Sequence, residues 1–508
     1  DIPLNILYPI IALFYIGNIT LIINFFFKIT TPVSLFLLLI PLSFNFSKNK
    51  RLNLNLSVEN LSLYLLTPLI LGISSSNINL AYDAGLYHLN HQHWIRNEKI
   101  IFGLSNNHNR FGYSSIVEHI NVNFWLDNNF ILLHFTNLIF IVIFFQIIYI
   151  LLFTDLFKFS ISILLYGFLD NFGFNGGKNG FIEIESIAKQ DTPFAIIFII
   201  TTYLLFKFFN DEEALNKRNL LIIFMFSVFS IELRLFGFIN ILFFLLICIN
   251  KYKFLNTFKI IFKDSALISL LGISFILKNL ITSSCMFYPV KLTCFNFLPW
   301  QSGNYSSPVK ENNALADFHI ALTTDNYNFW FSDWMAKEVN NTVFKNALIT
   351  FSLIVLLNIT IKNLNKEVLN KNIFLYFFYC LFSLIVWLIT APSIRMGVGI
   401  FLSLVLFLSI LFKGQENKFI KKNALLFSLF YFLTLGLVPQ TNNYFSFIDN
   451  LTNKEIRKIE VPVIEYRTNK TGYGVLPKEG DQCWINLECV RNKKTSKDNY
   501  YSYVIFRP

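Results

Sequence analysis

A short polar stretch of this chain concentrates side chains that can bind ligands or transfer protons. Six of the seven histidines lie between His88 and His134, and five of these lie between His88 and His119. The same stretch, residues 77–128, also holds Asp83, Arg96, Arg110 and Glu118. Because the chain around it is mostly apolar, this gathering of titratable groups is the first place to look for chemistry.

Asp83 is the candidate catalytic residue. It stands in AYDAGLYHL, directly after an apolar run. A carboxylate there can accept a proton from a substrate hydroxyl as a general base. If the segment is helical, Asp83 and Tyr87 share a face, as do His88 and His91. A helix N-cap is an equally good interpretation, because Asp before an apolar periodic run is a common helix start.

His88, His91 and His93 raise the question of a metal site. On a helix the first two share a face and the third does not, and no acidic or cysteine partner lies nearby at a fixed ligand spacing. We therefore predict hydrogen-bonding histidines in a wet loop and no cofactor, with a divalent metal as the alternative. The chain has no phosphate-binding loop, dinucleotide fingerprint or nucleophile elbow, so no cytoplasmic nucleotide site is predicted.

Arginine is scarce in this lysine-rich chain, which makes its positions informative. Arg234 interrupts an apolar run, and Arg395 lies in APSIRMGVG between two others. We expect both, with Arg110, at the outer membrane boundary, where a planar guanidinium can grip a phosphate through two parallel hydrogen bonds. The alternative is an internal ion pair of Arg234 with Glu232 or Asp191. Glu232 and Arg234 would face different ways on a helix.

The composition places the chain in a membrane. Of its 508 residues, 54% are hydrophobic and only 14% are charged, which is about half the charged fraction of a soluble domain. The net charge of +11 comes mostly from lysines that flank apolar runs, so we exclude nucleic-acid binding. The sequence starts at Asp1, which indicates a processed or incomplete start, and residues 4–27 are too long for a signal sequence and predict a spanning helix.

The apolar runs predict an all-α polytopic membrane protein with about 13 spans. The run at 219–250 is too long for one span and is interrupted by Glu232 and Arg234. Because lysines flank it on both sides, we predict a helical hairpin rather than one long tilted helix. The other predicted spans are 4–27, 31–46, 61–76, 129–153, 157–172, 191–208, 265–282, 343–361, 372–391, 396–412 and 423–440.

Loop charge orients these predicted spans. The basic segments are placed in the cytoplasm, which puts the N-terminus inside and the C-terminus outside. The segments then predicted outside are 77–128, 173–190, 283–342 and 441–508. We therefore divide the chain into a transmembrane domain, residues 1–440, with two large outer loops at 77–128 and 283–342, and a small extracytoplasmic cap, residues 441–508.

The cysteine positions fit this orientation. Cys285 and Cys294 share one predicted outer loop, and Cys483 and Cys489 share the tail, whereas the other two cysteines lie in predicted spans. Two close pairs on one side fit an oxidising exterior and predict two disulfides. Four free thiols are the alternative.

Several of these segments together resemble one family. YDAGLYHLNHQHWI, followed by GLSNNHNRFGYSS, resembles the first outer loop of a bacterial polytopic membrane protein family that is described as uncharacterised and related to GT-C type glycosyltransferases. LKNLITSSCMFYP with CFNFLPW, APSIRMGVG and GDQCWINLECV resemble the family's middle loop, its Arg-bearing turn and its Cys-Trp tail. The resemblance runs from about residue 60 to the C-terminus and departs at Glu232, where a lysine is expected.

The resemblance implies a GT-C-like fold and a defined reaction. Such enzymes carry an acid in the first outer loop, take a sugar from a polyprenyl-phosphate carrier and invert its anomeric centre, and the matching acid is Asp83. The lipid-phosphate leaving group needs positive charge, and the acceptor hydroxyl needs one base on the opposite face. We therefore place the substrate site at His88, His108, Arg110, Glu185, Asp191, Arg234, Lys278 and Arg395.

The sequence thus predicts a glycosyltransferase of the bacterial cytoplasmic membrane that acts on the extracytoplasmic side. Its expected partners are the bilayer, a polyprenyl-phosphate-linked sugar and a glycan, lipid or protein acceptor. A surface-polysaccharide polymerase and a transporter or flippase of lipid-linked sugars are the alternatives. A transporter would place charges near the bilayer midplane and often show an internal repeat, whereas no repeat is visible here and the charges are expected at one boundary.

Overall fold

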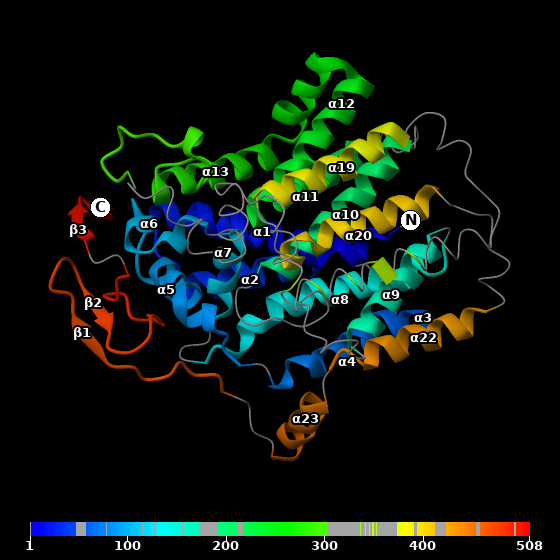
Figure 1. Cartoon of the computed structure of the whole chain (residues 1–508), viewed down its shortest axis with the longest axis horizontal. Helices are drawn as coiled ribbons and strands as arrows, with labels where there is room; N and C mark the ends of the chain where they lie inside the picture. Colours follow the sequence, from blue (N-terminus) through cyan, green and yellow to red (C-terminus); the bar gives the residue numbers. More distant parts are fainter. Residues whose placement is uncertain are drawn as a thin grey trace.

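The protein, seen in a computed structural model, is a bundle of apolar helices that carries a small β-containing module at one end (Figure 1). The structure describes residues 2–46, 57–77, 79–113, 115–125, 129–154, 156–171, 190–210, 217–301, 373–390, 394–411, 423–439, 441–453, 458–491 and 494–507, and six single positions between 302 and 372. The predicted span 343–361 and most of the loops 173–190 and 283–342 lie outside these residues.

Five stretches in the described part of the chain are long and apolar enough to cross a membrane: Leu4–Phe26, Ile131–Leu151, Asp191–Phe209, Leu235–Tyr252 and Ala266–Ser283. A sixth is present if α22 (Ala424–Gly436) and α23 (Thr441–Asn453), which meet at a bend of 79°, form one broken span. The chain is therefore a mainly helical membrane protein, and the prediction of about 13 spans is wrong for the residues described.

The reason for the lower number is helix length, because a bilayer core needs about 20 apolar residues. Several predicted spans, such as 31–46 and 157–172, were already shorter than this, and their helices have nearly the predicted bounds: α2 (Thr31–Phe46) has 16 residues and α9 (Phe157–Asn171) has 15. The first arm of the predicted hairpin, α11 (Lys217–Leu233), has 17. The apolar parts of α19 (Ile373–Thr390) and α20 (Ile394–Leu411) are shorter still. Apolar composition alone therefore overstates the number of full spans.

The remaining helices have the following bounds. The long ones are α1 (Leu4–Phe26), α8 (His134–Leu151), α10 (Asp191–Asn210), α12 (Phe238–Lys259) and α13 (Ala266–Ser283). The predicted span 61–76 is divided among α3 (Val58–Leu61), a π-helical turn (Ser62–Leu66), α4 (Thr67–Ile73) and a 3-10 turn (Ser74–Asn77). Further single turns lie at Val122–Phe124, Ile131–Leu133, Ile260–Asp264 and Lys291–Thr293.

The predicted helical hairpin at 219–250 is confirmed. α11 ends at Leu233, a 3-10 turn covers Leu235–Gly237, and α12 returns along α11. The turn requires a glycine, because a Cβ on Gly237 would lie 2.1 Å from the carbonyl carbon of Ser230. The tip of this hairpin therefore holds Arg234 at a fixed place on the bundle.

The segment predicted as the first outer loop is a compact helical layer. It contains a π-helical turn (Ala84–His88), α5 (Leu89–Asn97), α6 (Leu104–Asn107), a 3-10 turn (Asn109–Tyr113) and α7 (Ile116–Asn121). α7 packs on α1, and α6 packs on α13. The prediction that His88, His91 and His93 lie in a wet loop is wrong for the first two, because this packing buries them together with His108 and His119. His93 is half-buried and hydrogen-bonds to the Ile485 carbonyl.

The C-terminal tail docks on this layer (Figure 1). It holds two antiparallel hairpins, β1 (Tyr466–Thr468) with β2 (Val475–Pro477) and β3 (Ser496–Tyr500) with β4 (Tyr503–Arg507). Phe102 donates its backbone N–H to Val504 at 3.0 Å and accepts from Phe506 at 2.9 Å. The tail and the helical layer therefore cover one end of the bundle together.

Candidate functional site

Asp83 stands at the start of the π-helical turn. It occupies the N-cap position, but its side chain makes no capping hydrogen bond, and the residue is partly exposed. Asp83 therefore has the N-cap position that the alternative predicted, but its carboxylate does not cap the helix. A partly exposed carboxylate without a cap bond is available to accept a proton.

Several of the charged residues predicted for the site act on Tyr87. Burial raises the pKa of its hydroxyl and Asp83 raises it further, while the positive charges of Arg110 and Arg234 oppose the rise. The Arg110 guanidinium carbon lies 5.9 Å from the Tyr87 ring centre. The charges of Asp83, Arg110 and Arg234 therefore all act on Tyr87, although Arg234 is distant in the sequence.

Two predicted histidines border the same tyrosine. The ring centres of His88 and His108 lie 4.0 Å and 6.2 Å from that of Tyr87. The local cause is the π-helical turn, in which Leu89 N–H bonds back to Ala84 and each turn takes up an extra residue. Such turns are frequent at functional sites.

Arg234 is held by an ion pair with Asp191, the first residue of α10. This is the ion-pair alternative raised from the sequence. Arg234 Nε is buried and has no hydrogen-bond partner among the described residues, so the guanidinium keeps one donor for an anion. Glu232 faces another way, as predicted, and accepts a hydrogen bond from Asn18 Nδ2 at 2.9 Å.

A second group of polar residues is buried behind this site, and Glu118 is its centre. His88 Nδ1 donates to Glu118 Oε1 at 2.5 Å, and Gln92 Nε2 donates to the other carboxylate oxygen at 2.8 Å. Trp125 Nε1 donates in turn to Gln92 Oε1 at 2.7 Å. His88, which we predicted to bind substrate, is therefore fixed by a buried carboxylate that also sets its tautomer.

Lys278 of α13 supplies the positive charge of this buried group. Its side chain is 1% exposed, and the carboxylates of Glu118 and Glu232 both act on its charge. Its ammonium lies 4.6 Å from the ring centre of Phe275. Charges inside a membrane bundle are costly unless they are paired, so Lys278 and the two carboxylates depend on one another.

Three histidines around the two groups stay neutral. Burial, and then the positive charge of Lys278, hold the pKa of His91 and of His119 well below its ordinary value. Burial, with Arg491 and Arg110, lowers the pKa of His108 to about 3. In the part of the chain that the structure describes, no three His, Cys, Asp or Glu side chains are grouped so that they could hold a metal.

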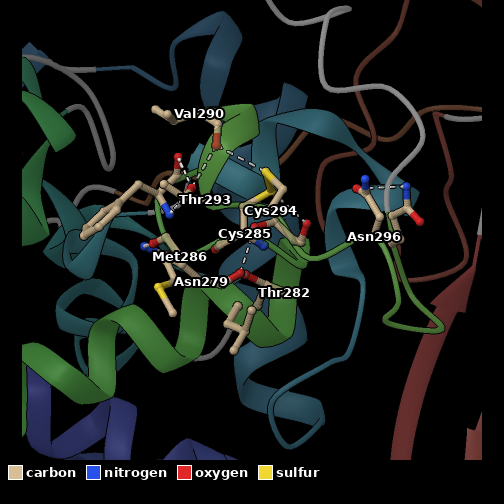
Figure 2. The surroundings of a disulfide bond; sticks show 12 residues. Asn279, Thr282, Cys285, Met286, Val290, Thr293, Cys294 and Asn296 are labelled. Carbon is tan, nitrogen blue, oxygen red and sulfur yellow. Dashed lines mark hydrogen bonds between the residues drawn. A yellow bond between two sulfur atoms is a disulfide. The ribbon is translucent and has the colours of Figure 1, made fainter.

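The loop after α13 contains the first predicted disulfide, between Cys285 and Cys294 (Figure 2). Figure 2 shows it beside the end of α13, where Asn279 Nδ2 donates to the Met286 carbonyl at 3.3 Å. Thr293 closes the loop by donating to the Val290 carbonyl at 2.8 Å. These bonds tie the loop to the helix that carries Lys278.

The second predicted disulfide, between Cys483 and Cys489, lies in the tail beside Asp83. Trp484 donates its backbone N–H to Gly85 at 2.8 Å, and a Cβ on Gly85 would lie 2.6 Å from the Trp484 ring. This close approach explains why a glycine stands two residues after Asp83. The tail is thus part of the site's wall.

The tail also contributes residues to this wall to which the sequence analysis gave no role. Arg491 donates to Asp481 at 2.6 Å and lies 3.4 Å from His108 Nε2, and Tyr82 donates to the same aspartate. The motif GDQCWINLECV marked this region, but only its two cysteines were given a role. Glu118 had a signal that went unused, because it is an acidic residue inside the apolar run IVEHI.

Two predicted site residues cannot be placed against the others. Glu185 lies outside the described residues. Arg395 is the second residue of α20, and its side chain lies outside them as well. Their assignment stays a prediction.

The fold and the site together define a helical membrane protein with a charged, partly covered site at one end of its bundle. Residues 4–402 match the model of a family described as "Domain of unknown function (DUF8201)", and the chain belongs to that family. No curated protein and no solved structure matches this chain.

Proposed function

We propose that this protein is a GT-C-like inverting glycosyltransferase of the bacterial cytoplasmic membrane, with its site on the extracytoplasmic side. Its donor is a sugar linked to polyprenyl phosphate, and its acceptor is a hydroxyl of a cell-surface glycan, lipid or protein. The observation that carries the proposal is that the charges of Asp83, Arg110 and Arg234 act on one buried hydroxyl, that of Tyr87, with the Arg110 guanidinium over its ring.

The proposed reaction assigns each charge a task. Asp83 takes the proton of the acceptor hydroxyl while the acceptor oxygen forms a bond to the anomeric carbon. The bond from that carbon to the phosphate oxygen breaks on the opposite face, and polyprenyl phosphate leaves with the electron pair. Arg110 and the free donor of Arg234 stabilise the departing phosphate.

Glu118 and Lys278 have a supporting task in this proposal. Glu118 orients His88 beside Tyr87, and Lys278 balances the buried negative charge. Neither is required to touch the reacting atoms. His88, His108 and Asp191 shape the site and position Arg234, and Glu185 and Arg395 stay candidates for donor binding.

The test is a transfer assay on the full-length protein in nanodiscs with a panel of radiolabelled polyprenyl-phosphate sugars. We expect consumption of one donor class by the wild type and by Asp449→Asn, a matched change on the exposed face of α23. Asp83→Asn is expected to abolish consumption while the protein stays folded. Full activity of Asp83→Asn would exclude Asp83 as the base.

A second candidate is a flippase for lipid-linked sugars, with a surface-polysaccharide polymerase as a related alternative that uses the same donors. The observation in favour of a flippase is that Lys278, Glu232 and Asn18 are buried between helices, where transporters hold functional charges. Tight binding of the lipid without consumption of any donor would favour this second candidate. Consumption that depends on Asp83 would exclude a pure flippase.

A further inference from the structure

A groove lies at the corner between α1 and α2, away from the site described above. It has a volume of about 890 Å³, which is within the range of ligand-binding pockets. One wall comes from the end of α1 and the start of α2, a second from the residues after α5, and the third from Ser502 in the β3–β4 turn. Three separate parts of the chain therefore build it.

Hydrogen bonds hold the walls of the groove in fixed positions relative to one another. Asn24 accepts from the Ile100 N–H at 2.8 Å through its backbone and donates to the Glu98 carbonyl at 3.1 Å through its side chain. Tyr503 donates its hydroxyl to the Phe25 carbonyl at 3.1 Å. The end of a candidate membrane span is thus joined to both the helical layer and the tail.

The groove is divided into a polar and an apolar part. The polar part holds Lys28 and Lys99, with Glu98 as the one acidic side chain of the lining, so that the lining carries one net positive charge. The apolar part holds Phe27 and Phe36, whose side chains are 66% and 65% exposed. Large exposed aromatic side chains beside lysines at the end of a span are suited to a lipid, with its headgroup at the lysines and its chains on the rings.

We propose that this groove binds an anionic phospholipid of the surrounding bilayer. The phosphodiester lies between Lys28 and Lys99, and the acyl chains lie along Phe27 and Phe36. The single negative charge of a phosphodiester complements the net charge of the lining. Because the lipid contacts α1, α2 and the β3–β4 turn together, it fastens the tail to the membrane part of the protein.

The groove is separate from the proposed reaction site. The continuous helical stretch 84–97 lies between Asp83 and Lys99, and fourteen residues at 1.5 Å each extend about 20 Å. A phosphate bound at Lys99 is therefore too far away to leave from a sugar at Asp83. The inference does not depend on the glycosyltransferase proposal.

The experiment measures lipid retained by the full-length protein with native mass spectrometry after exchange into mixed phosphatidylglycerol and phosphatidylcholine. We expect preferential retention of phosphatidylglycerol, with a loss of about fivefold in affinity for Lys28→Gln, because a basic residue near an anionic lipid surface contributes about 1 kcal/mol. Lys28 is exposed, so its replacement leaves the fold intact. Lys28→Arg keeps the charge and is expected to retain the lipid.

The matched control is Lys291→Gln, an exposed lysine in the loop after α13 that does not line the groove. Equal retention of the two lipids, or an equal loss in Lys28→Gln and Lys291→Gln, would overturn the proposal. Displacement of the lipid by inorganic phosphate alone would overturn it in favour of a simple anion site. Stronger retention of polyprenyl phosphate than of phosphatidylglycerol would overturn it in favour of a donor-lipid site.

Discussion

Two groups of charges lie next to each other at one end of the bundle, and they differ in what their carboxylates contact. Asp83 is partly exposed and makes no capping bond, whereas Glu118 is buried and accepts hydrogen bonds from His88 and Gln92 on its two oxygens. Arg110 and Arg234 act with Asp83 on Tyr87, and the positive charge of Lys278 opposes the negative charge of Glu118.

This difference assigns a different role to each acid. A carboxylate whose two oxygens both accept buried hydrogen bonds is fixed in place and has no free oxygen to offer a substrate. A partly exposed carboxylate that makes no capping bond can accept a hydrogen bond from a bound substrate. The outer group is therefore suited to chemistry and the buried group to holding the fold.

The largest effect is expected at Asp83. Asp83→Asn should lower the transfer rate by about 10²- to 10⁴-fold, the usual contribution of a general base, with no change in unfolding temperature. Glu118→Gln should instead lower the unfolding temperature, because it weakens the bond from a buried histidine. Transfer rates and unfolding temperatures measured for both variants test this assignment. If Glu118→Gln abolished transfer and Asp83→Asn lowered only the unfolding temperature, the two roles would be exchanged.

The second-largest effect is expected from removal of the buried cation, Lys278. Lys278→Met should destabilise the protein by about 3 to 5 kcal/mol, because it leaves buried carboxylates without their positive partner. The double variant Lys278→Met with Glu232→Gln should recover part of this loss, since one of the two negative charges is then removed. Chemical unfolding in detergent gives the free energy of unfolding of the wild type, of each single variant and of the double variant. Strictly additive losses would contradict the coupling between Lys278 and Glu232.

The buried histidines predict a loss of stability in acid. His91, His108 and His119 have pKa values below their ordinary value in the folded protein, so the unfolded chain binds more protons as the pH falls. Their contribution to stability is complete above about pH 6.5 and is lost as the pH falls through the range between the unfolded and folded pKa values, at up to about 1.4 kcal/mol per pH unit for each histidine.

The measurement is thermal unfolding of the wild type and of His108→Gln between pH 8 and pH 5. His108 faces Arg491 and Arg110, both of which oppose its protonation. The variant cannot take up that proton, so its unfolding temperature should fall less steeply with acid. Identical slopes for the two proteins would rule out a contribution from His108.

The smallest effect is expected at the wall contributed by the tail. The pair of Arg491 with Asp481 is about one-third exposed, so Arg491→Ala should cost less than about 1 kcal/mol. Gly85→Ala tests a second contact, the one between the tail and the helical layer, because its Cβ would meet the Trp484 ring. Protease sensitivity of the tail is expected to rise for both variants, and unchanged cleavage would show that the tail docks without these contacts.

The sequence predicted the parts of the fold that depend on local pattern. Lysines on both sides of 219–250, with Glu232 and Arg234 inside it, were enough to predict the hairpin, because charge location orients membrane helices. The number of spans was not predictable in the same way. The ends of α2 and α9 were predicted to within one residue, but both helices are shorter than a bilayer core, so counting each apolar run as a full span gave too many spans.

The sequence by itself determined that this chain belongs in a membrane and that its titratable side chains gather between Asp83 and Glu118, because both follow from which residue types stand near one another. It also predicted the two disulfides, since the cysteines of each pair are close along the chain. Only the tertiary structure decided which charges meet. Arg234 pairs with Asp191, the charges of Glu118 and Glu232 act on Lys278, and Arg491 contacts His108, because tertiary packing brings together residues that no local spacing connects.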